Sequence, residues 1–264
     1  MQETPAPDDA LAALNLSPEE VSALPAKLRT SLIGYLLRWE AAELAYRCLE
    51  HLLETSGHLV SIHDSLARAY LELDQPDRAV AVMQTRHRLG MSNSSQALAA
   101  RAHAAAGDID SAQTIARKLV IEHPEMMLTW SLLADVCISA GDWDAAEEAL
   151  RRREAVRPET PATAHAQARL WQARGESEKA LLWAQTSLGR YERDQRRPPV
   201  GLLRLLEMLY RTTGRSAQAA ETASGLASRH QREWEEVCER LGPVPAGSEL
   251  PVPPAPATLS LIHI

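Results

Sequence analysis

The chain has 264 residues, 45% of them hydrophobic, and a formal net charge of −7 at pH 7. This acidic balance argues against nucleic acid as a partner, because nucleic-acid-binding surfaces are basic. We expect neither a signal peptide nor a membrane span, since the start lacks basic and apolar regions and no apolar run approaches about 18 residues. The three cysteines show no CxxC spacing, which favours reduced thiols and a cytoplasmic location.

The first predicted element is a short helix that follows Ser17. Pro18 suits the first turn of a helix, and Glu20 stands three residues after Ser17, as in a capping box. Pro25 then ends the helix, because proline cannot continue one. Residues 1–24 are therefore expected to form an N-terminal segment with one short helix.

A 34-residue repeat organises the centre of the chain. Gly107, Gly141 and Gly175 are separated by 141 − 107 = 34 and 175 − 141 = 34 residues. Three alanines keep the same step: Ala112, Ala146 and Ala180. A period of this length predicts stacked helix–turn–helix units. The glycines are expected to end the first helix of each unit with a positive φ.

The clearest unit begins at Met127. Its key residues are, in order, Trp130, Leu133, Ala134, Cys137, Gly141, Ala146, Leu150 and Pro158. This series resembles the tetratricopeptide repeat (TPR), whose pattern is W-x2-L-G-x2-Y, A-x3-F and P. The resemblance covers about residues 25–230 and implies an all-α fold, an α-α superhelix of about six TPR-like hairpins. Asp74 takes the glycine position in the second hairpin, and Arg86 and Arg153 take a position that is usually alanine.

The end of the repeat array departs from the regular step. The last turn glycine, Gly214, follows Gly175 by 214 − 175 = 39 residues, which predicts an insertion within 190–199. Residues 231–241 carry apolar side chains with helical spacing. We expect them to cap the last hairpin, as a separate helix or as a continuation of the preceding one. The array with its cap is thus expected to span 25–241.

The composition changes abruptly at Gly242. Repeated prolines predict a stiff, extended linker over 242–258. The last six residues, 259–264, read LSLIHI, which is the translation of a common sequencing-adaptor end. We therefore expect 259–264 to be a library scar rather than native sequence, with a genuine short tail as the alternative.

No motif predicts catalysis, a metal site or a cofactor site. The chain has no HExxH, no GxSxG, no glycine-rich phosphate loop and no Cys/His cluster with zinc spacing. The basic run Arg151-Arg152-Arg153 is flanked by Glu147, Glu148 and Glu154. This pattern is typical of a solvated helix face with i, i+4 ion pairs.

Candidate binding residues lie on the first helices of the repeats, which line a concave groove in the family. The resemblance implies that the ninth position of each unit points into that groove, which selects Arg68, Arg101, Asp135 and Arg169. Asp64 and His165 stand one turn earlier. In the last unit Arg197, Arg204 and Arg211 are spaced by seven and are expected to share a face.

A groove rich in arginine favours a partner with an acidic segment, because guanidinium binds carboxylate in a bidentate way. The alternative is that these arginines are merely exposed polar positions in an arginine-rich chain. We expect a non-enzymatic scaffold that binds a protein or peptide in the groove, with no cofactor, no nucleic acid and no membrane. The rival hypothesis is the partner-binding arm of a longer, truncated multidomain protein. The sequence leaves the partner and the oligomeric state open.

Overall fold

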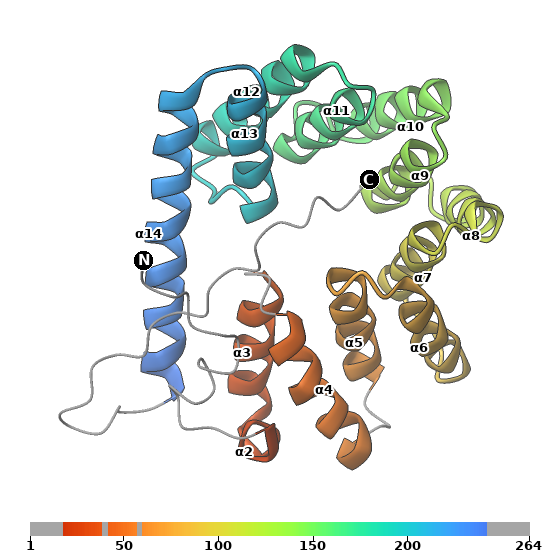
Figure 1. Ribbon diagram of the computed structural model, residues 1–264. Helices are drawn as coiled ribbons and strands as arrows, with labels where there is room; N and C mark the ends of the chain where they lie inside the picture. Colours follow the sequence, from red (N-terminus) through yellow and green to blue (C-terminus); the bar gives the residue numbers. More distant parts are fainter. Residues whose placement is uncertain (1–17, 39–41, 57–59, 242–264) are drawn as a thin grey trace. The chain divides into compact units, whose positions relative to one another are not determined.

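The computed structural model describes residues 18–38, 42–56 and 60–241, and within them the regular structure is entirely helical (Figure 1). The expectations for the linker over 242–258 and the tail over 259–264 lie outside the described residues. The helices are α2 (Pro18–Ala23), α3 (Ala26–Arg38), α4 (Ala42–Ser56), α5 (Val60–Glu72), α6 (Pro76–Arg88), α7 (Asn93–Ala105), α8 (Ile109–Glu122), α9 (Met127–Ser139), α10 (Trp143–Val156), α11 (Pro161–Ala173), α12 (Ser177–Arg193), α13 (Val200–Thr212) and α14 (Ser216–Leu241). From α3 onward they form six consecutive hairpins, the number expected. The short helix α2 begins at Pro18 and ends before Pro25, as predicted.

The turns inside the hairpins have the predicted backbone conformation. Gly107, Gly141 and Gly175 adopt φ values of 81°, 71° and 79°. Asp74, which replaces glycine in the second hairpin, also has a positive φ, of 54°. At Gly141 the following residue, Asp142, donates its backbone N–H to the Cys137 carbonyl at 2.9 Å and closes the end of α9.

The residue after the turn glycine starts the second helix. Asp142 accepts a hydrogen bond on Oδ1 from the backbone N–H of Ala145 at 3.2 Å, and Asp108 accepts one from Ser111 at 3.1 Å. A carboxylate at this position satisfies a free N–H and interacts favourably with the positive end of the helix. The Gly-Asp pair therefore ends one helix and begins the next within two residues.

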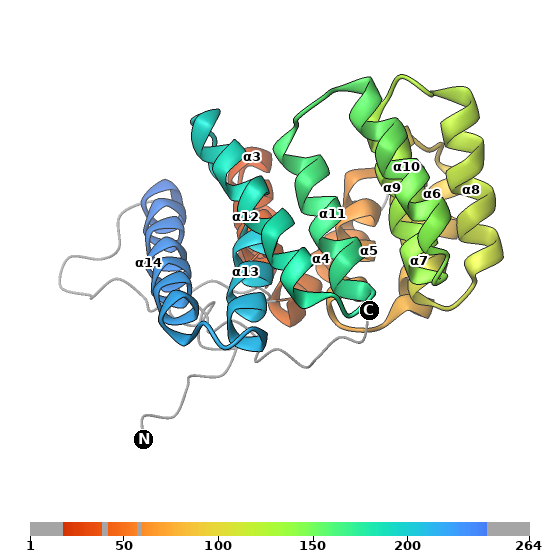
Figure 2. The ribbon, with the colours of Figure 1, turned by 90° about the horizontal axis from the view of Figure 1, so that it is seen from above.

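The contacts divide the chain into two units, and each is described here by itself. Unit 2 is formed by residues 91–226. In it the first helix α9 contacts both α7 and α11, and each of the three also packs on the second helix of its own hairpin (Figure 2). The crossings are built from alanines with no exposed surface: Ala100, Ala112, Ala116, Ala134 and Ala146. Small residues at these phases let the helices approach closely, as the repeat pattern predicted.

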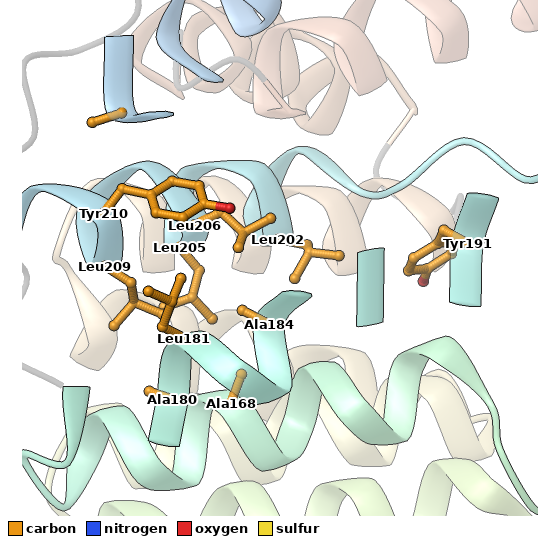
Figure 3. Packing of buried hydrophobic residues seen from close by; sticks show 11 residues of the cluster. Ala168, Ala180, Leu181, Ala184, Tyr191, Leu202, Leu205, Leu206, Leu209 and Tyr210 are labelled. Atoms are coloured by element: carbon orange, nitrogen blue, oxygen red, sulfur yellow. The ribbon is translucent and has the colours of Figure 1, made fainter. Parts of the chain in front are cut away.

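The core between α12 and α13 in unit 2 is richer in leucine. Leu202, Leu205, Leu206 and Leu209 of α13 form one buried cluster with α12, in which Leu181 takes part (Figure 3). Burying a leucine side chain contributes about 1.5–3 kcal/mol. This cluster therefore holds α13 against α12 even though the repeat step lengthens before it.

The predicted insertion is visible as a longer helix and a connector. Helix α12 has 17 residues, whereas α10 has 14, and α13 begins only at Val200. Arg197 therefore lies in the connector and not on α13. The expectation that it shares a helical face with Arg204 and Arg211 is wrong, because seven-residue spacing defines a face only where all three residues are helical.

Unit 1 contains α2–α6 together with the part of α14 from Ala227 onward. Residues 231–241 continue α14 without a break. Trp234 has no exposed surface, and its ring lies 5.2 Å from that of Tyr35 on α3. Its aromatic side chain thus packs on the first hairpin, and the expectation that the segment covers the last hairpin stays a prediction. The hydrophobic gain from burying an aromatic ring is non-directional and does not depend on closeness in sequence.

Candidate functional site

Three predicted residues of unit 2 meet across three successive first helices. Asp135 on α9 accepts a hydrogen bond from Arg101 Nη2 on α7 at 3.1 Å and from Arg169 Nη1 on α11 at 2.9 Å, one on each carboxylate oxygen. The Asp135 side chain is 12% exposed, whereas those of Arg101 and Arg169 are 47% and 38% exposed. The two guanidinium groups are therefore held toward each other at the surface, and the three side chains together carry one positive charge.

A second row of side chains lies one turn earlier on the same helices. Ser131 stands four residues before Asp135, and His165 stands four residues before Arg169. Ser131 donates its hydroxyl to the Met127 carbonyl at 2.6 Å. Together with the ion-paired row, these residues define what we call the first-helix face: Arg101, Ser131, Asp135, His165 and Arg169.

His165 is a neutral imidazole at pH 7. Burial, with the positive charge of Arg169 and, more weakly, Arg153, lowers its pKa to about 4, and the nearby Asp135 only partly opposes this. Among the described residues no side chain or backbone group forms a hydrogen bond with His165. A ring N–H therefore remains available on the first-helix face.

Arg153 lies beneath this face and corrects an expectation. Arg151 and Arg152 form the predicted exposed ion pairs, with Glu148 at 2.9 and 2.7 Å. Arg153 is instead only 6% exposed, with Nε 2.6 Å from Ser131 Oγ and a second hydrogen bond from Nη1 to Thr163 Oγ1. Burial lowers the pKa of its guanidinium, although nearby acidic groups oppose the shift. The solvated face thus includes only two of the three arginines, because the third points inward between α9 and α11.

The same arrangement occurs in unit 1. Arg86 on α6 is 5% exposed and donates from Nε to Asp64 Oδ1 on α5 at 3.0 Å. Arg86 follows Asp64 by 22 residues, and Arg153 follows Ser131 by the same number. From the sequence, both arginines are unusual substitutions, and Arg153 is also expected on a solvated helix face. An arginine at an alanine phase, with a polar residue 22 positions before it, was the signal that could have revealed them.

The remaining predicted residues are placed separately. Arg204 on α13 is half-buried. Burial lowers its pKa, and the negative charge of Glu207 partly opposes this shift. Arg211 is exposed and pairs with Glu207 at 2.6 Å. Arg68 is exposed on α5 and belongs to unit 1. Its position relative to the first-helix face of unit 2 therefore stays a prediction.

Unit 1 has a basic surface hollow of its own. It has a volume of about 440 Å³ and is lined by Lys27, Leu28, Ser31 and Arg240. Arg240 Nη1 donates to Ser31 Oγ at 3.2 Å, and Arg240 Nη2 lies 3.8 Å from Glu236. The arginine of this hollow is thus already partnered.

In the described ranges, no three His, Cys, Asp or Glu side chains are grouped so that they could hold a metal ion. Cys48, Cys137 and Cys238 are buried free thiols, and burial raises the pKa of Cys48 to about 11. A thiol with a raised pKa is a poor nucleophile, because the thiolate is the reactive form. None of the helices that the structure describes is long and apolar enough to cross a bilayer.

Comparison with known proteins agrees with the repeat and its phases. Tetratricopeptide repeat models match residues 103–170 and 61–85. A sequence search of curated proteins gives no match.

Solved structures are similar to this chain in fold. A tetratricopeptide repeat protein from Parabacteroides merdae aligns with a TM-score of 0.58 at 15% identity, covering 89% of this chain and 88% of its own. The TPR protein TTC0263 from Thermus thermophilus gives 0.52 at 16% identity, covering 69% and 98%. A chain of the APC/C hetero-tetramer Cut9–Hcn1 gives 0.52 at 13% identity, covering 84% of this chain and 42% of that one.

The two model matches, these folds and the glycine-ended hairpins agree with one another. The chain is a tetratricopeptide repeat protein with an all-α, solenoid-like fold.

Proposed function

We propose that this protein is a non-enzymatic interaction module that binds an acidic protein or peptide segment on the first-helix face. The observation that carries the proposal is the row formed by Arg101, Asp135 and Arg169 on successive repeats. TPR proteins generally mediate protein–protein interactions, and the Cut9–Hcn1 structure is itself an assembly of two proteins. A cytoplasmic location is part of this proposal, and the three free thiols support it.

The charges of the row favour an anionic ligand. A guanidinium has five N–H donors, and the ion pair with Asp135 uses one donor on each of Arg101 and Arg169. Their other donors form no hydrogen bond within the part of the chain that the structure describes and are available to a ligand. The row keeps one net positive charge on a chain whose net charge is −7, so it is locally distinct from the rest of the surface.

Arg204 and Arg211 on α13 would extend the binding surface within unit 2, and Arg68 would act in the same way in unit 1. Each exposed ion pair with a ligand is weak, about 0–1 kcal/mol. Affinity must therefore come from several arginines together. It should also weaken with salt, because exposed charges are screened within about 8 Å at physiological ionic strength.

The test is to select ligands for the full chain from a random peptide library displayed on phage. We expect the selected peptides to be enriched in Asp and Glu. The triple variant R68E/R101E/R169E should bind them at least about tenfold more weakly, a loss of about 1.4 kcal/mol, with an unchanged helical melt.

The control variant, R117E/R151E/R157E, makes the same charge change at exposed positions outside the first helices. It should retain most of the affinity. Selection of peptides without acidic residues, or equal binding of both variants at low and high salt, would reject the first-helix face as the binding surface.

A further inference from the structure

A buried positive charge without a carboxylate partner lies under the first-helix face. Arg153 is 6% exposed, and its hydrogen bonds go to the hydroxyl oxygens of Ser131 and Thr163. Within the described part of the chain no carboxylate forms an ion pair with it. A buried charge is costly to keep unless an opposite charge compensates it. Its field therefore favours an anion near Ser131.

The equivalent arginine of unit 1 shows how such a charge is compensated in this protein. Arg86 has the same phase and the same 22-residue separation from its partner, but that partner is the carboxylate of Asp64. Where unit 1 has a carboxylate, unit 2 has the neutral hydroxyl of Ser131. Asp135 and Glu154 act on Arg153 only from a distance, so the carboxylate that Asp64 supplies in unit 1 has no counterpart at Ser131.

The side chains around this place can hold a carboxylate. His165 offers a neutral ring N–H with no partner among the described residues. Arg169 uses Nη1 for Asp135, and its other N–H groups bind none of the residues that the structure describes. The Ser131 hydroxyl donates to the Met127 carbonyl, four residues before it. This carbonyl already accepts a hydrogen bond within the helix, so the hydroxyl can turn to a ligand carboxylate at little cost.

The neighbouring row is a less suitable place. Asp135 already occupies the space between Arg101 and Arg169 and would repel a second carboxylate. One turn earlier, over Ser131, no acidic residue belongs to the first-helix face. The favourable position for an anion is therefore displaced toward the N-terminal end of α9.

We propose that a side-chain carboxylate of an acidic protein segment binds over Ser131, where His165 and Arg169 donate hydrogen bonds to it and the buried Arg153 balances its charge. This inference rests on the proposed function and specifies one subsite of it. Arg153 does not contact the bound carboxylate. It holds the Ser131 hydroxyl by a hydrogen bond and adds a positive electrostatic potential, so it is a positioning residue.

The experiment uses the full chain and a fluorescently labelled, C-terminally amidated hexaglutamate peptide, with hexaglutamine as the uncharged probe. Affinity is measured by fluorescence anisotropy at low salt and neutral pH. The decisive variant is Ser131→Asp, which copies the Asp64–Arg86 pair and supplies the carboxylate internally. We expect S131D to weaken hexaglutamate binding at least about tenfold and to raise the melting temperature, because Arg153 gains a partner.

The matched control is Ser139→Asp. Ser139 is exposed on the same helix, two turns further on, and donates to the Asp135 carbonyl at 3.2 Å. S139D adds the same charge away from Arg153. It should therefore change the affinity for hexaglutamate less than about threefold, because exposed charges contribute little free energy. Equal losses in S131D and S139D would mean general repulsion and would overturn the subsite.

A second readout follows the histidine directly. The pKa of His165 in the wild type, measured by NMR, should rise when hexaglutamate is added, because a neighbouring carboxylate favours the protonated ring. The charged groups around the ring are Arg169, Asp135 and Arg153, and none of these changes in the experiment. An unchanged His165 pKa with bound peptide would also overturn the subsite.

Failure of this subsite and failure of the proposed function give different results. Some library peptides could bind the wild type and S131D equally tightly but fail to bind R68E/R101E/R169E. This result would reject only the subsite. Absence of any selected peptide would reject the proposed function itself.

Discussion

Arg153 reaches back across its own helical hairpin to Ser131, and its Nε lies 2.6 Å from the Ser131 Oγ. Arg86 reaches Asp64 in the same way at 3.0 Å. In both hairpins an inward-pointing arginine replaces a small residue of the repeat. The protein therefore uses one structural device twice, once with an internal carboxylate and once without.

The Arg86–Asp64 pair should contribute measurably to stability. Asp64→Asn keeps the size of the side chain but removes the carboxylate that forms an ion pair with the buried Arg86. We expect a loss of about 1–3 kcal/mol in the free energy of unfolding, the usual cost of an unsatisfied buried group. Chemical denaturation measures this loss. Glu239→Gln, at an exposed position of α14 in the same unit, should leave stability within about 0.5 kcal/mol.

The turn glycine of the clearest repeat should resist substitution. Gly141 has a φ of 71°, and a Cβ there would meet only Trp143 at an ordinary 3.9 Å. The cost of Gly141→Val is thus backbone strain rather than a clash, at about 1–2 kcal/mol or more. Gly189→Ala, at an exposed helical glycine of α12, should instead stabilise the protein by about 0.5–1 kcal/mol. Equal effects of the two changes in thermal melts would contradict the assigned role of the turn.

The helix crossing at Ala146 leaves no space for a larger side chain. Ala146 has no exposed surface and packs in one cluster with Ala134 and Leu150. Ala146→Leu should destabilise by about 1–3 kcal/mol, because overfilling forces the helices apart. The comparison is Ala217→Leu on the exposed side of α14 in the same unit, which should be nearly neutral. Similar melting temperatures for both variants would show that the crossing tolerates expansion.

Acid should destabilise the protein in part through His165. The folded pKa is lowered to about 4, whereas an unperturbed histidine has a pKa of about 6.5. Between these values the unfolded chain binds a proton that the native state does not, so the free energy of unfolding falls as pH decreases through this window. His165→Gln should flatten this dependence, as measured by denaturant unfolding at several pH values. The same change at the half-buried His123 serves as the control, and an equally steep dependence in H165Q would argue against a neutral His165 in the native state.

The sequence alone was sufficient for the repeat and its turns. Gly107, Gly141 and Gly175 recur in fixed phase, and each turn depends on a local requirement for positive φ that glycine meets without strain. The phase of Arg101, Asp135 and Arg169 likewise placed these three residues on neighbouring helices. Periodic features of this kind can be predicted because each repeat meets its neighbour in the same way.

Two features depended on tertiary structure. Trp234 packs on Tyr35, which is 234 − 35 = 199 residues away, and no local pattern specifies such a contact. Arg151, Arg152 and Arg153 are identical in chemistry and adjacent in sequence, yet only Arg153 is buried. Successive residues of a helix point in directions about 100° apart, so the rotation of α10 against α9 and α11 decides which arginine turns inward. The sequence thus determined the repeats and the row of charges, and the packing of the helices determined which charge lies beneath it.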